Sequence, residues 1–562
     1  MGLRFFNKCR VDDCHNKIFL RIMKILFNFA EIKNFRIMGM YLNPNAALLE
    51  SAMRSEIYVD KSLIVRELNR LVNTENKYVC ISRPRRFGKS MASHLISSYY
   101  GKNTNALPLF QKLKIYNDES FGSHFGKYNV IKLDINGFYR TKKQMPLVDR
   151  INQKVVAEIM KSFPDADIDD SDTLDEAMLK VYDATGEQFV IIMDEYDVLI
   201  REEVDDNVFA PYLEFLNGLF KNSTLKPAIA MAYLTGILPI VRDRVESKLN
   251  EFMECSMYDA FRMSEFVGFT EDEVKGLCDR YSMDFTECKR WYDGYELSKE
   301  ISVYNPKSVV EAMLRHRYSS YWSITGSFEN IKDYIEIDFD GIRKDVETML
   351  GGGRVAVNVL GFLNTKKCFK DKHDVFTYLI HLGYLTYDKD AKECYIPNYE
   401  VREQWVLAIK NNPNYEYILR MINGSKKLLE ETMKGNSDYV ANTLKEAHSR
   451  ETNPLTYNDE SSFQSAIGLA YFYAGSLYTI VKEMPSGDGY ADMAFIPVRP
   501  QDPALIVELK SSTSTAEGAI AQIKKKNYKQ ILHNYSGNMV LVGIKYFPGT
   551  HEHECVIERV EY

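Results

Sequence analysis

The sequence lacks the features of a membrane-spanning or secreted protein. Its longest apolar stretch near the N-terminus, KIFLRIMKILFNFAEIKNFRIM, is broken by charged residues and lacks the about twenty apolar residues of a membrane span. No small-residue cleavage site follows, and no Ser or Thr supports myristoylation of Gly2. We expect residues 1–39 to be an extension upstream of a natural start at Met38 or Met40, with an amphipathic surface helix as the alternative.

The nine cysteines include no C-x-x-C pair. The two closest, Cys9 and Cys14, have no second pair nearby to complete the four ligands of a zinc site. Scattered cysteines of odd number are typical of a reduced, cytoplasmic protein. The net charge of -7 supplies no overall field that attracts nucleic acid, so contact with DNA or RNA must come from a local patch.

The length of 562 residues, with 45% hydrophobic and 27% charged residues, favours about two to four globular domains. From residue 58 to about 263, apolar runs alternate with helical patterns. The runs lie at 78–82, 129–135, 189–197 and 228–237. Runs rich in Val, Ile and Leu predict strands buried on both faces, hence a parallel sheet with helices on each side.

The pattern between 265 and 400 is mainly helical. Thr270 to Glu273 forms a capping box, and Asn305-Pro306 provides an N-cap followed by a proline suited to the first helical position. Residues 376–398 predict a helix, a strand, an Asp/Lys turn and a second strand. This combination is typical of a winged-helix-like lid.

The last part of the chain has a different pattern. From 400 to 450 we expect connecting helices, with turns at Asn423-Gly424 and Gly435-Asn436. The order then becomes α-β-β-β-α-β, with a helix at 460–475, strands at 477–484, 490–498 and 504–510, a helix at 516–532 and a strand at 538–547.

A candidate phosphate-binding loop, SRPRRFGKS, follows the first predicted strand and precedes a helix. The standard pattern G-x-x-x-x-G-K-[ST] would place glycine where this chain has Arg83. In such a loop, backbone N–H groups and the helix N-terminus cradle phosphate oxygens. Lys89 would reach the β- and γ-phosphates, and the Ser90 hydroxyl would hold Mg²⁺.

Acidic partners for this loop follow another buried strand, in FVIIMDEYD. Asp194 would bind Mg²⁺ directly or through water, and Glu195 would polarise the attacking water. Asp197 is either a helix cap or a supporting group. A lone G-K-S is usually chance and an acidic residue at a strand end is often a cap, but their joint occurrence favours a nucleotide site.

The next predicted strand ends in Thr235-Gly236, where the threonine is a candidate sensor of the γ-phosphate. Arg242 and Arg244 follow and are weaker candidates for charge stabilisation, because most such arginines form surface ion pairs.

A second site is predicted in the hairpin GYADMAFIPVRPQDPALIVELKSS, whose turn is centred near Pro500-Gln501. Pairing across that centre places Asp492 opposite Glu508, and Lys510 shares a face with Glu508 because side chains alternate along a strand. Two carboxylates beside an ammonium suit a Mg²⁺ site that activates water and stabilises phosphate charge. Lys510 would orient or deprotonate that water.

Further candidates lie on neighbouring elements: Glu460, Glu483, Gln522 and Tyr528, with Lys524, Lys525, Lys526 and Lys529 nearby. The lysines either contact a phosphate backbone or form only the solvated face of a helix, and the second interpretation is favoured for them alone. For the Asp/Glu/Lys trio the alternative is an exposed, salt-bridged hairpin.

Ten short blocks occur in order along the chain. They are YVDKS (58–62), RPRRFGKS (83–90), MDEYD (193–197), LTGI (234–237), GFTEDEV (268–274), WYDGY (291–295), YNPKSV (304–309), GYLT (383–386), IPN (396–398) and the AD…ELK pair (491–510). In this combination the chain, from Met40 onward, resembles bacterial and archaeal AAA-ATPase-like proteins with a C-terminal PD-(D/E)XK nuclease-like domain.

The resemblance implies that the missing first glycine is a feature of the family. The residues of the phosphate loop, or Walker A motif, would be Pro84, Arg85, Arg86, Phe87, Gly88, Lys89 and Ser90. Asp194 and Glu195 would form the Walker B motif. Asp492, Glu508 and Lys510 match the nuclease motif, and Gln522 lies in the helix that often carries an auxiliary glutamine. ATP and Mg are the implied cofactors, and the architecture suggests mobile elements or defence.

We therefore expect an α/β protein with a P-loop NTPase parallel sheet, a helical, winged-helix-like lid and an α-β-β-β-α-β restriction-endonuclease-like domain. The expected domains are 1–39 (extension), 40–263 (ATPase core), 264–400 (lid), 401–452 (helical linker) and 453–562 (nuclease-like domain).

The expected function is ATP binding and hydrolysis coupled to Mg-dependent cleavage of DNA or RNA, without a membrane partner and with oligomer formation left open. One alternative is a nucleotide-dependent binding module with an inactive nuclease fold, and another is a switch that binds ATP without turnover.

Overall fold

A computed structural model describes residues 39–562 apart from short internal gaps and the last residue. The gaps are 103, 142–144, 241–250, 299–300, 323–331, 333–334, 336–337, 364–368, 411, 452–459, 487–488, 500, 512–514, 526–536 and 548–551. Side chains are also left undescribed at 448–451, 460–462, 482–486, 489–491 and 511. Within the described residues, no helix has the length and apolar character needed to cross a membrane.

The described chain divides into two compact units. The first contains Met1–Lys77, Ser93–Asp194 and Ala210–Tyr233, and the second contains Tyr78–Ala92, Glu195–Phe209 and Leu234–Tyr562. Helices of the first unit are α2 (Ala47–Met53), α3 (Ile64–Asn69), α5 (Leu107–Phe110), α6 (Phe121–His124), α7 (Ile135–Arg140), α8 (Leu147–Ser162) and α9 (Leu174–Thr185). Two helices, α4 (Lys89–Tyr100) and α11 (Asp206–Phe220), have residues in both units.

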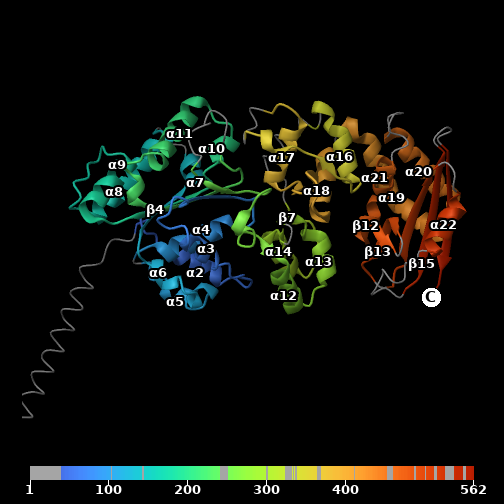
Figure 1. Ribbon diagram of the computed structural model, residues 1–562, viewed down its shortest axis with the longest axis horizontal. Helices are drawn as coiled ribbons and strands as arrows, with labels where there is room; N and C mark the ends of the chain where they lie inside the picture. The colour runs from blue at the N-terminus through green and yellow to red at the C-terminus, as the bar shows by residue number, and fades with distance from the viewer. Residues whose placement is uncertain are drawn as a thin grey trace, which may run out of the picture. The chain divides into compact units, whose positions relative to one another are not determined.

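A five-stranded sheet has the strand order β2-β3-β4-β1-β5 (Figure 1). Its strands are β1 (Tyr78–Ser82), β2 (Asn129–Asp134), β3 (Phe189–Asp194), β4 (Ile229–Gly236) and β5 (Met253–Cys255). β2 pairs with β3, and β1 with β5, in parallel. β1, β3 and β4 are buried throughout, as continuous apolar runs predict, so the predicted parallel sheet is confirmed. The short β5 was not predicted, because three residues give too little pattern.

Both predicted helix starts of the lid are confirmed. The Thr270–Glu273 capping box begins α12 (Glu271–Tyr281), and the Asn305 side chain caps α14 (Pro306–Arg315). The other helices of the lid are α13 (Phe285–Tyr292), α16 (Ile342–Leu350) and α17 (Lys372–Leu382). The lid also has two three-stranded sheets. One consists of β6 (Phe269–Thr270), β7 (Tyr295–Ser298) and β8 (Ile301–Tyr304), and the other of β9 (Val355–Ala356), β10 (Thr386–Asp388) and β11 (Glu393–Tyr395). The helix–hairpin predicted at 376–398 is α17, β10 and β11.

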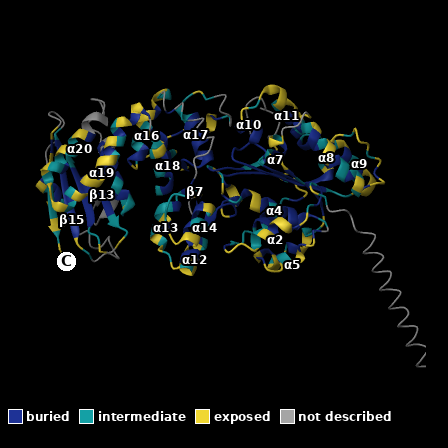
Figure 2. Cartoon of the chain, turned by 180° about the vertical axis from the view of Figure 1, so that it is seen from behind, coloured by how far each residue is buried: buried dark blue, intermediate teal, exposed yellow. Residues whose placement is uncertain are grey.

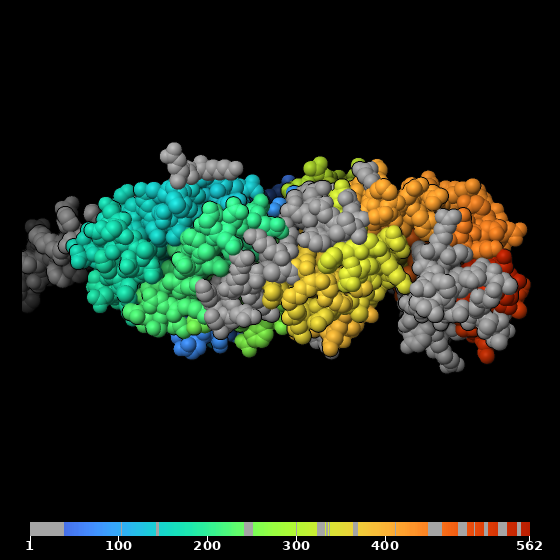
Figure 3. Space-filling view, turned by 90° about the horizontal axis from the view of Figure 1, so that it is seen from above, coloured from blue at the N-terminus to red at the C-terminus, as the bar shows by residue number. Residues whose placement is uncertain are grey.

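The next three helices are α18 (Tyr399–Ile409), α19 (Glu416–Lys434) and α20 (Ser437–Glu451). α19 and α20 carry exposed residues on the face seen in Figure 3. Gly435 ends α19 in a left-handed conformation, so the turn predicted there is confirmed. The turn predicted at Asn423-Gly424 is wrong, because α19 runs through it. A stripe of buried residues, which includes Ile418, Met421 and Leu428, favours the helix over local turn propensity.

The C-terminal sheet has the order β12-β13-β14-β15-β16, and Figure 2 shows its central strands buried. Its elements are α21 (Glu460–Ala470), β12 (Tyr478–Ser486), β13 (Gly489–Pro497), β14 (Ala504–Ser511), α22 (Ala516–Lys525), β15 (Met539–Phe547) and β16 (Glu552–Val560). The predicted order α-β-β-β-α-β is confirmed up to β15. The edge strand β16 was missed, although the run CVIERV has strand character.

One face of this sheet packs against α22, which lies beside β15 in Figure 1. The apolar core between this face and α22 consists of Ala494, Ala504, Ile506, Ile520, Ile523, Met539 and Leu541. Farther along β13 and β14, the same face carries charged residues instead. The apolar part fixes the helix on the sheet, and the charged part forms the second candidate site.

Candidate functional site

The predicted phosphate loop joins the end of β1 to the start of α4. Gly88 has a φ of 97° and Arg86 has a φ of 70°, so two residues of the loop adopt left-handed backbone conformations before the helix. Loops of this kind present backbone N–H groups to an anion in front of a helix N-terminus. The predicted strand–loop–helix context of the G-K-S sequence is therefore present.

Arg83, which replaces the first glycine of the standard pattern, is fully buried. Its guanidinium donates hydrogen bonds to the Cys255 carbonyl at 3.0 Å and to the Ser256 carbonyl at 3.1 Å. These carbonyls lie at the end of β5, so Arg83 fastens the base of the loop to a strand that is distant in sequence. Of the other loop arginines, Arg85 is half-buried and Arg86 is exposed.

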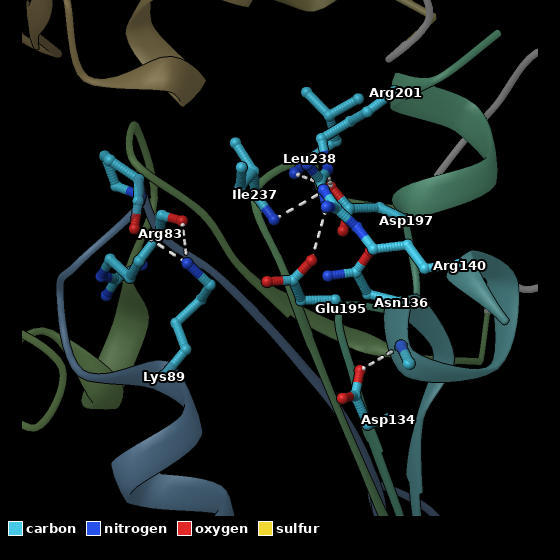
Figure 4. A network of polar contacts seen from close by, with 12 residues as sticks. Arg83, Lys89, Asp134, Asn136, Arg140, Glu195, Asp197, Arg201, Ile237 and Leu238 are labelled. Atoms are coloured by element: carbon cyan, nitrogen blue, oxygen red, sulfur yellow. Dashed lines mark hydrogen bonds and ion pairs between the residues drawn. The ribbon is translucent and has the colours of Figure 1, made fainter. Parts of the chain in front are cut away.

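The Lys89 side chain is folded back into the loop. Its ammonium donates hydrogen bonds to the Arg83 carbonyl at 2.9 Å and to the Pro84 carbonyl at 2.8 Å (Figure 4). Only 8% of Lys89 is exposed, whereas the adjacent Ser90 is exposed. A phosphate oxygen in the loop would compete with these two carbonyls for the same ammonium.

The other side of the loop packs against the lid. The Phe87 ring contacts Tyr295 edge-on, with 5.1 Å between ring centroids. The Tyr295 hydroxyl donates to the Gly383 carbonyl at 2.9 Å, and a Cβ built at Gly383 would lie 2.8 Å from the Pro84 side chain. The side chains of Pro84 and Phe87 thus hold the loop against the lid by packing.

Arg86 continues this connection through hydrogen bonds. It donates to the Tyr321 carbonyl at 3.0 Å, while the Tyr321 N–H donates to the carboxylate of Glu400 at 2.6 Å. Glu400, which is 1% exposed in α18, also accepts from Ser308 and from the Trp322 N–H. Burial raises the pKa of Glu400 to about 7, although these donors oppose the shift.

This raised pKa predicts a pH-dependent stability of the lid. The folded state holds a proton on Glu400 that the unfolded chain releases near pH 4.3, so the stabilisation is complete below that pH and is lost as pH rises through 7. We expect the unfolding free energy of the wild type to fall by about 2.5 kcal/mol more than that of Glu400→Gln between pH 5 and 8. Denaturant titration followed by tryptophan fluorescence measures it, because Trp291, Trp322 and Trp405 all lie in this region. If the unfolding free energies of the wild type and Glu400→Gln changed equally between pH 5 and 8, the prediction would be contradicted.

Glu195 lies in a network that the sequence did not reveal. Arg201 donates to the Glu195 carboxylate at 3.0 Å and to the Asp197 carboxylate at 2.9 Å, and Figure 4 shows the three side chains converging. Asp197 is fully buried and also accepts from the N–H groups of Ile237 and Leu238. Asp197 is therefore a buried anchor for Arg201, which in turn orients Glu195.

Two residues at the end of β4, Thr235 and Gly236, pack tightly against their neighbours. A Cβ at Gly236 would lie 2.5 Å from the Asp197 carboxylate, so only glycine fits there. The Thr235 side chain is fully buried, and its hydroxyl donates to the Ile81 carbonyl at 2.9 Å. This hydrogen bond joins β4 to β1, and contact of Thr235 with a γ-phosphate stays a prediction.

Asp194, in the first unit, ends β3 and is 7% exposed. Burial lowers the pKa of the nearby Lys132 to about 8, although the Asp194 and Asp134 carboxylates oppose the shift. The Lys132 ammonium contacts Nδ1 of His94. Asp194 therefore lies close enough to a buried ammonium to influence its pKa. Arg242 and Arg244 lie outside the described residues.

The second candidate site lies at the charged end of the C-terminal sheet face. Met493 pairs with Val507 in the antiparallel β13–β14 ladder, so the next pair along it is Asp492 and Glu508, as the hairpin predicts. The Asp492 carboxylate accepts a hydrogen bond from the Leu509 N–H at 2.5 Å. Glu508 is 1% exposed. The two carboxylates thus share one face of the sheet.

Two further polar side chains meet at Glu508. The Lys510 ammonium lies 3.0 Å from its Oε1 atom, and the Gln522 amide donates to the same oxygen from α22. Asp492, Glu508, Lys510 and Gln522 are therefore brought together by three elements. The predicted side chains of Glu460, Glu483 and Tyr528 lie outside the described residues, as do those of Lys526 and Lys529.

The metal fit of this site follows from its donors. Mg²⁺ keeps several waters and is commonly bound by one or two carboxylates plus substrate phosphates. Within the described ranges, no group of three or more His, Cys, Asp or Glu side chains is placed to hold a metal ion. Asp492 and Glu508 thus fit a Mg²⁺ ion that is completed by water and phosphate, and they do not form a closed protein cage.

Gly543 lets α22 approach the site. Gly543 belongs to β15 and pairs with Glu508 of the neighbouring strand β14. A Cβ built at Gly543 would lie 2.3 Å from the Ala516 carbonyl of α22. Gly543→Ala is expected to displace α22, loosen the contact of Gln522 with Glu508 and cost about 1–3 kcal/mol of unfolding free energy. Thermal denaturation measures the loss of stability. Gly518→Ala in the same helix is the control, because its Cβ would only reach ordinary contact with Thr515. Equal effects of the two substitutions would contradict the prediction.

Comparisons with known proteins assign two regions of the chain to known families. Residues 50–246 match the family model described as "Predicted AAA-ATPase", and residues 458–555 match the "PD-(D/E)XK nuclease superfamily". The chain therefore contains an AAA-ATPase-like domain followed by a domain of the PD-(D/E)XK nuclease superfamily. Its fold is the predicted α/β class, with a P-loop ATPase sheet and a mixed C-terminal sheet.

One relative is an uncharacterized protein in the vnfD 5' region of Azotobacter chroococcum mcd 1, 25% identical over 280 residues. The match spans 48% of this chain and about half, 51%, of that protein. Among solved structures, the Aeropyrum pernix ORC2 protein in ADPNP–ADP complexes has 9% identity and a TM-score of 0.27, with 64% of this chain and 96% of that chain covered. The A. pernix ORC1 protein in complex with DNA has 10% identity and a TM-score of 0.25, with 67% and 98% covered.

Proposed function

We propose that this protein binds and hydrolyses ATP and that its C-terminal domain cleaves phosphodiester bonds of DNA or RNA with Mg²⁺. The observation that carries the nuclease assignment is the convergence of Asp492, Glu508, Lys510 and Gln522 at one end of a sheet face. A structural salt bridge alone needs neither the second carboxylate on this face nor a glutamine from a separate helix. The coarser assignment to nucleotide-binding and nuclease superfamilies supports the same chemistry.

Each residue of the nuclease site has a distinct proposed role. Asp492 and Glu508 hold the metal ion, which supplies Lewis-acid stabilisation of the phosphate and a more acidic water. Lys510, 3.0 Å from Glu508, orients or deprotonates the water. Gln522 fixes the Glu508 carboxylate through its amide. The Leu509 N–H fixes Asp492, so both carboxylates are held before the substrate arrives.

In the nucleotide site, we assign phosphate binding to Lys89 and the N–H groups of the loop, and Mg²⁺ to Ser90 and Asp194. Glu195 polarises the attacking water, and Arg201 sets its orientation through the anchored Asp197. Nucleotide state would govern the nuclease domain, because the loop contacts the lid through Phe87 and Arg86. The fusion of these two activities suits a cytoplasmic bacterial protein of defence or of a mobile element.

The decisive experiment is a nuclease screen of the purified full chain on single- and double-stranded DNA and RNA. Each substrate is incubated with Mg²⁺ or with EDTA, and with or without ATP. We expect cleavage of at least one substrate with Mg²⁺, none with EDTA, and a rate that changes with ATP. Binding without cleavage on every substrate would favour the runner-up, a nucleotide-dependent binding module with an inactive nuclease fold. Tight ATP binding without turnover, unchanged by Glu195→Gln, would favour a switch.

A further inference from the structure

Helix α18 is bonded to a lid segment that packs against the phosphate loop. Its buried Glu400 carboxylate accepts a hydrogen bond from the Trp322 N–H at 2.8 Å. A Cβ built at Gly383 would lie 2.8 Å from the Pro84 side chain and 2.9 Å from the Trp322 ring, so the three residues are in close contact. The start of α18 is therefore connected to Pro84 of the loop through Trp322.

Two positions farther along α18, Arg402 contacts the nuclease-like domain. Its guanidinium donates to the Leu350 carbonyl at the end of α16 at 2.6 Å, and it lies 3.9 Å from the centroid of the Phe472 ring. A Cβ built at Gly475 would lie 2.7 Å from the guanidinium, which therefore occupies the space beside the Gly475 backbone. Phe472 and Gly475 belong to a short helix of the nuclease-like domain, η8 (Phe472–Ser476). The same turn of α18 thus serves both sides.

Two further contacts join the lid to the nuclease-like domain. Arg290 of α13 donates to the Gly475 carbonyl, and its guanidinium lies 5.0 Å from the ring centroid of Tyr399 in α18. A Cβ built at Gly351, after α16, would lie 2.4 Å from the Ser465 carbonyl of α21. Closely packed contacts of this kind transmit strain, because no free space absorbs a displacement. A movement of α18 is therefore expected to displace η8 and α21.

The contacts of η8 continue to the strand that carries Asp492. The Tyr471 ring, next to Phe472, lies 5.5 Å from the Phe495 ring of β13, measured between centroids. Phe495 follows Asp492 by three positions in β13, and η8 leads into the neighbouring strand β12. Packed side chains therefore connect α18 with the strand of a proposed metal ligand.

The phosphate loop has a part that nucleotide binding changes. The Lys89 ammonium is bonded to the carbonyls of Arg83 and Pro84, and a phosphate oxygen would compete for it. Pro84 is also the residue in contact with Gly383, so loss of its bond to Lys89 alters the position at which the loop meets the lid. A ligand with different affinity for the two loop arrangements shifts the equilibrium between them.

We propose that α18 transmits the nucleotide state of the phosphate loop to the nuclease-like domain, and that Arg402 is the residue that couples the two. The role rests on the proposed function and adds the route by which ATP regulates cleavage. In this role Arg402 contacts neither ATP nor nucleic acid. It acts through the position of η8 and of the strands that follow.

The activity test compares the full wild-type chain with Arg402→Met, which keeps a side chain against Phe472 and removes the guanidinium. We expect ATP to change the wild-type cleavage rate by about fivefold or more, the lower range of allosteric coupling, and that of Arg402→Met by less than about twofold. Arg420→Met, at an exposed arginine of α19, is the control and should keep the wild-type response. A wild-type response to ATP in folded Arg402→Met would overturn the proposal. If Arg402→Met does not fold, Arg290→Met decides in the same way, because it removes the bond to Gly475.

A second measurement needs no cleavage. Hydrogen exchange of the backbone amides of residues 472–481 is followed with and without ATP, and we expect ATP to change it in the wild type and not in Arg402→Met. If the wild type cleaves no substrate but this exchange responds to ATP through Arg402, the nuclease function fails and the coupling stands. If ATP binds and nucleic acid is cut, but neither exchange nor cleavage responds to ATP, the coupling fails and the two activities stand. If ATP does not bind, nucleotide binding and the coupling both fail.

Discussion

Lys89→Ala is expected to weaken ATP binding by about 100-fold or more and to abolish hydrolysis. The ammonium is the only side-chain cation that the described loop holds inside its turn, where it now bonds the carbonyls of Arg83 and Pro84. Exchange of those carbonyls for phosphate oxygens gives charge-assisted hydrogen bonds, each of about 1.5–3 kcal/mol. Isothermal titration calorimetry and a phosphate-release assay measure the two effects.

The same substitution separates binding from folding. Without nucleotide, Lys89→Ala should retain the thermal midpoint of the wild type within a few degrees, because Arg83, Pro84 and Phe87 hold the loop through other contacts. ATP should raise the midpoint of the wild type and not that of the variant. Lys112→Ala, at an exposed lysine after α5, is the control. An ATP affinity within about threefold of the wild type would remove Lys89 from the site.

The sequence predicted the loop but not the use of its first arginine. Strand, loop and helix are local, so the spacing of G-K-S after an apolar run was enough to place Lys89. The role of Arg83 depends on carbonyls of Cys255 and Ser256, more than 170 positions away, and on a strand too short to predict. The same limit applies to Arg201, because its orientation of Glu195 depends on the buried Asp197 and on backbone of Ile237 and Leu238.

In the candidate nuclease site, too, some residues could be placed from local sequence and others could not. Asp492, Glu508 and Lys510 belong to one hairpin, whose turn fixes the register, so their shared face followed from counting residues. Gly543 reaches the site through a parallel pairing of β15 with β14, two strands that are separated in sequence by α22 and its connections. No local pattern sets that register. A glycine in an apolar strand therefore carried no signal until its neighbours, Glu508 across the ladder and Ala516 of α22, were known.

Asp492→Asn is expected to reduce the cleavage rate by about 1,000-fold or more without unfolding the domain. The asparagine side-chain oxygen can still accept the hydrogen bond from the Leu509 N–H, so the fold and the local geometry are retained. The lost negative charge leaves Glu508 as the one carboxylate of the described site, and Mg²⁺ binding weakens. Metal-ion stabilisation supplies several kcal/mol to the transition state, and each 1.36 kcal/mol is about tenfold in rate.

The control for this variant lies in the same hairpin. Asp502→Asn makes the same chemical change at the turn, away from the paired Asp492 and Glu508, and should cut at the wild-type rate. Initial rates with Mg²⁺ on the substrate found in the screen, thermal midpoints and ATP affinity are measured for all three proteins. Retained ATP affinity and thermal midpoint with lost cleavage would assign Asp492 to the chemistry. Cleavage that survives Asp492→Asn would refute the site, because neither Glu508 nor Lys510 can supply the second metal-binding carboxylate.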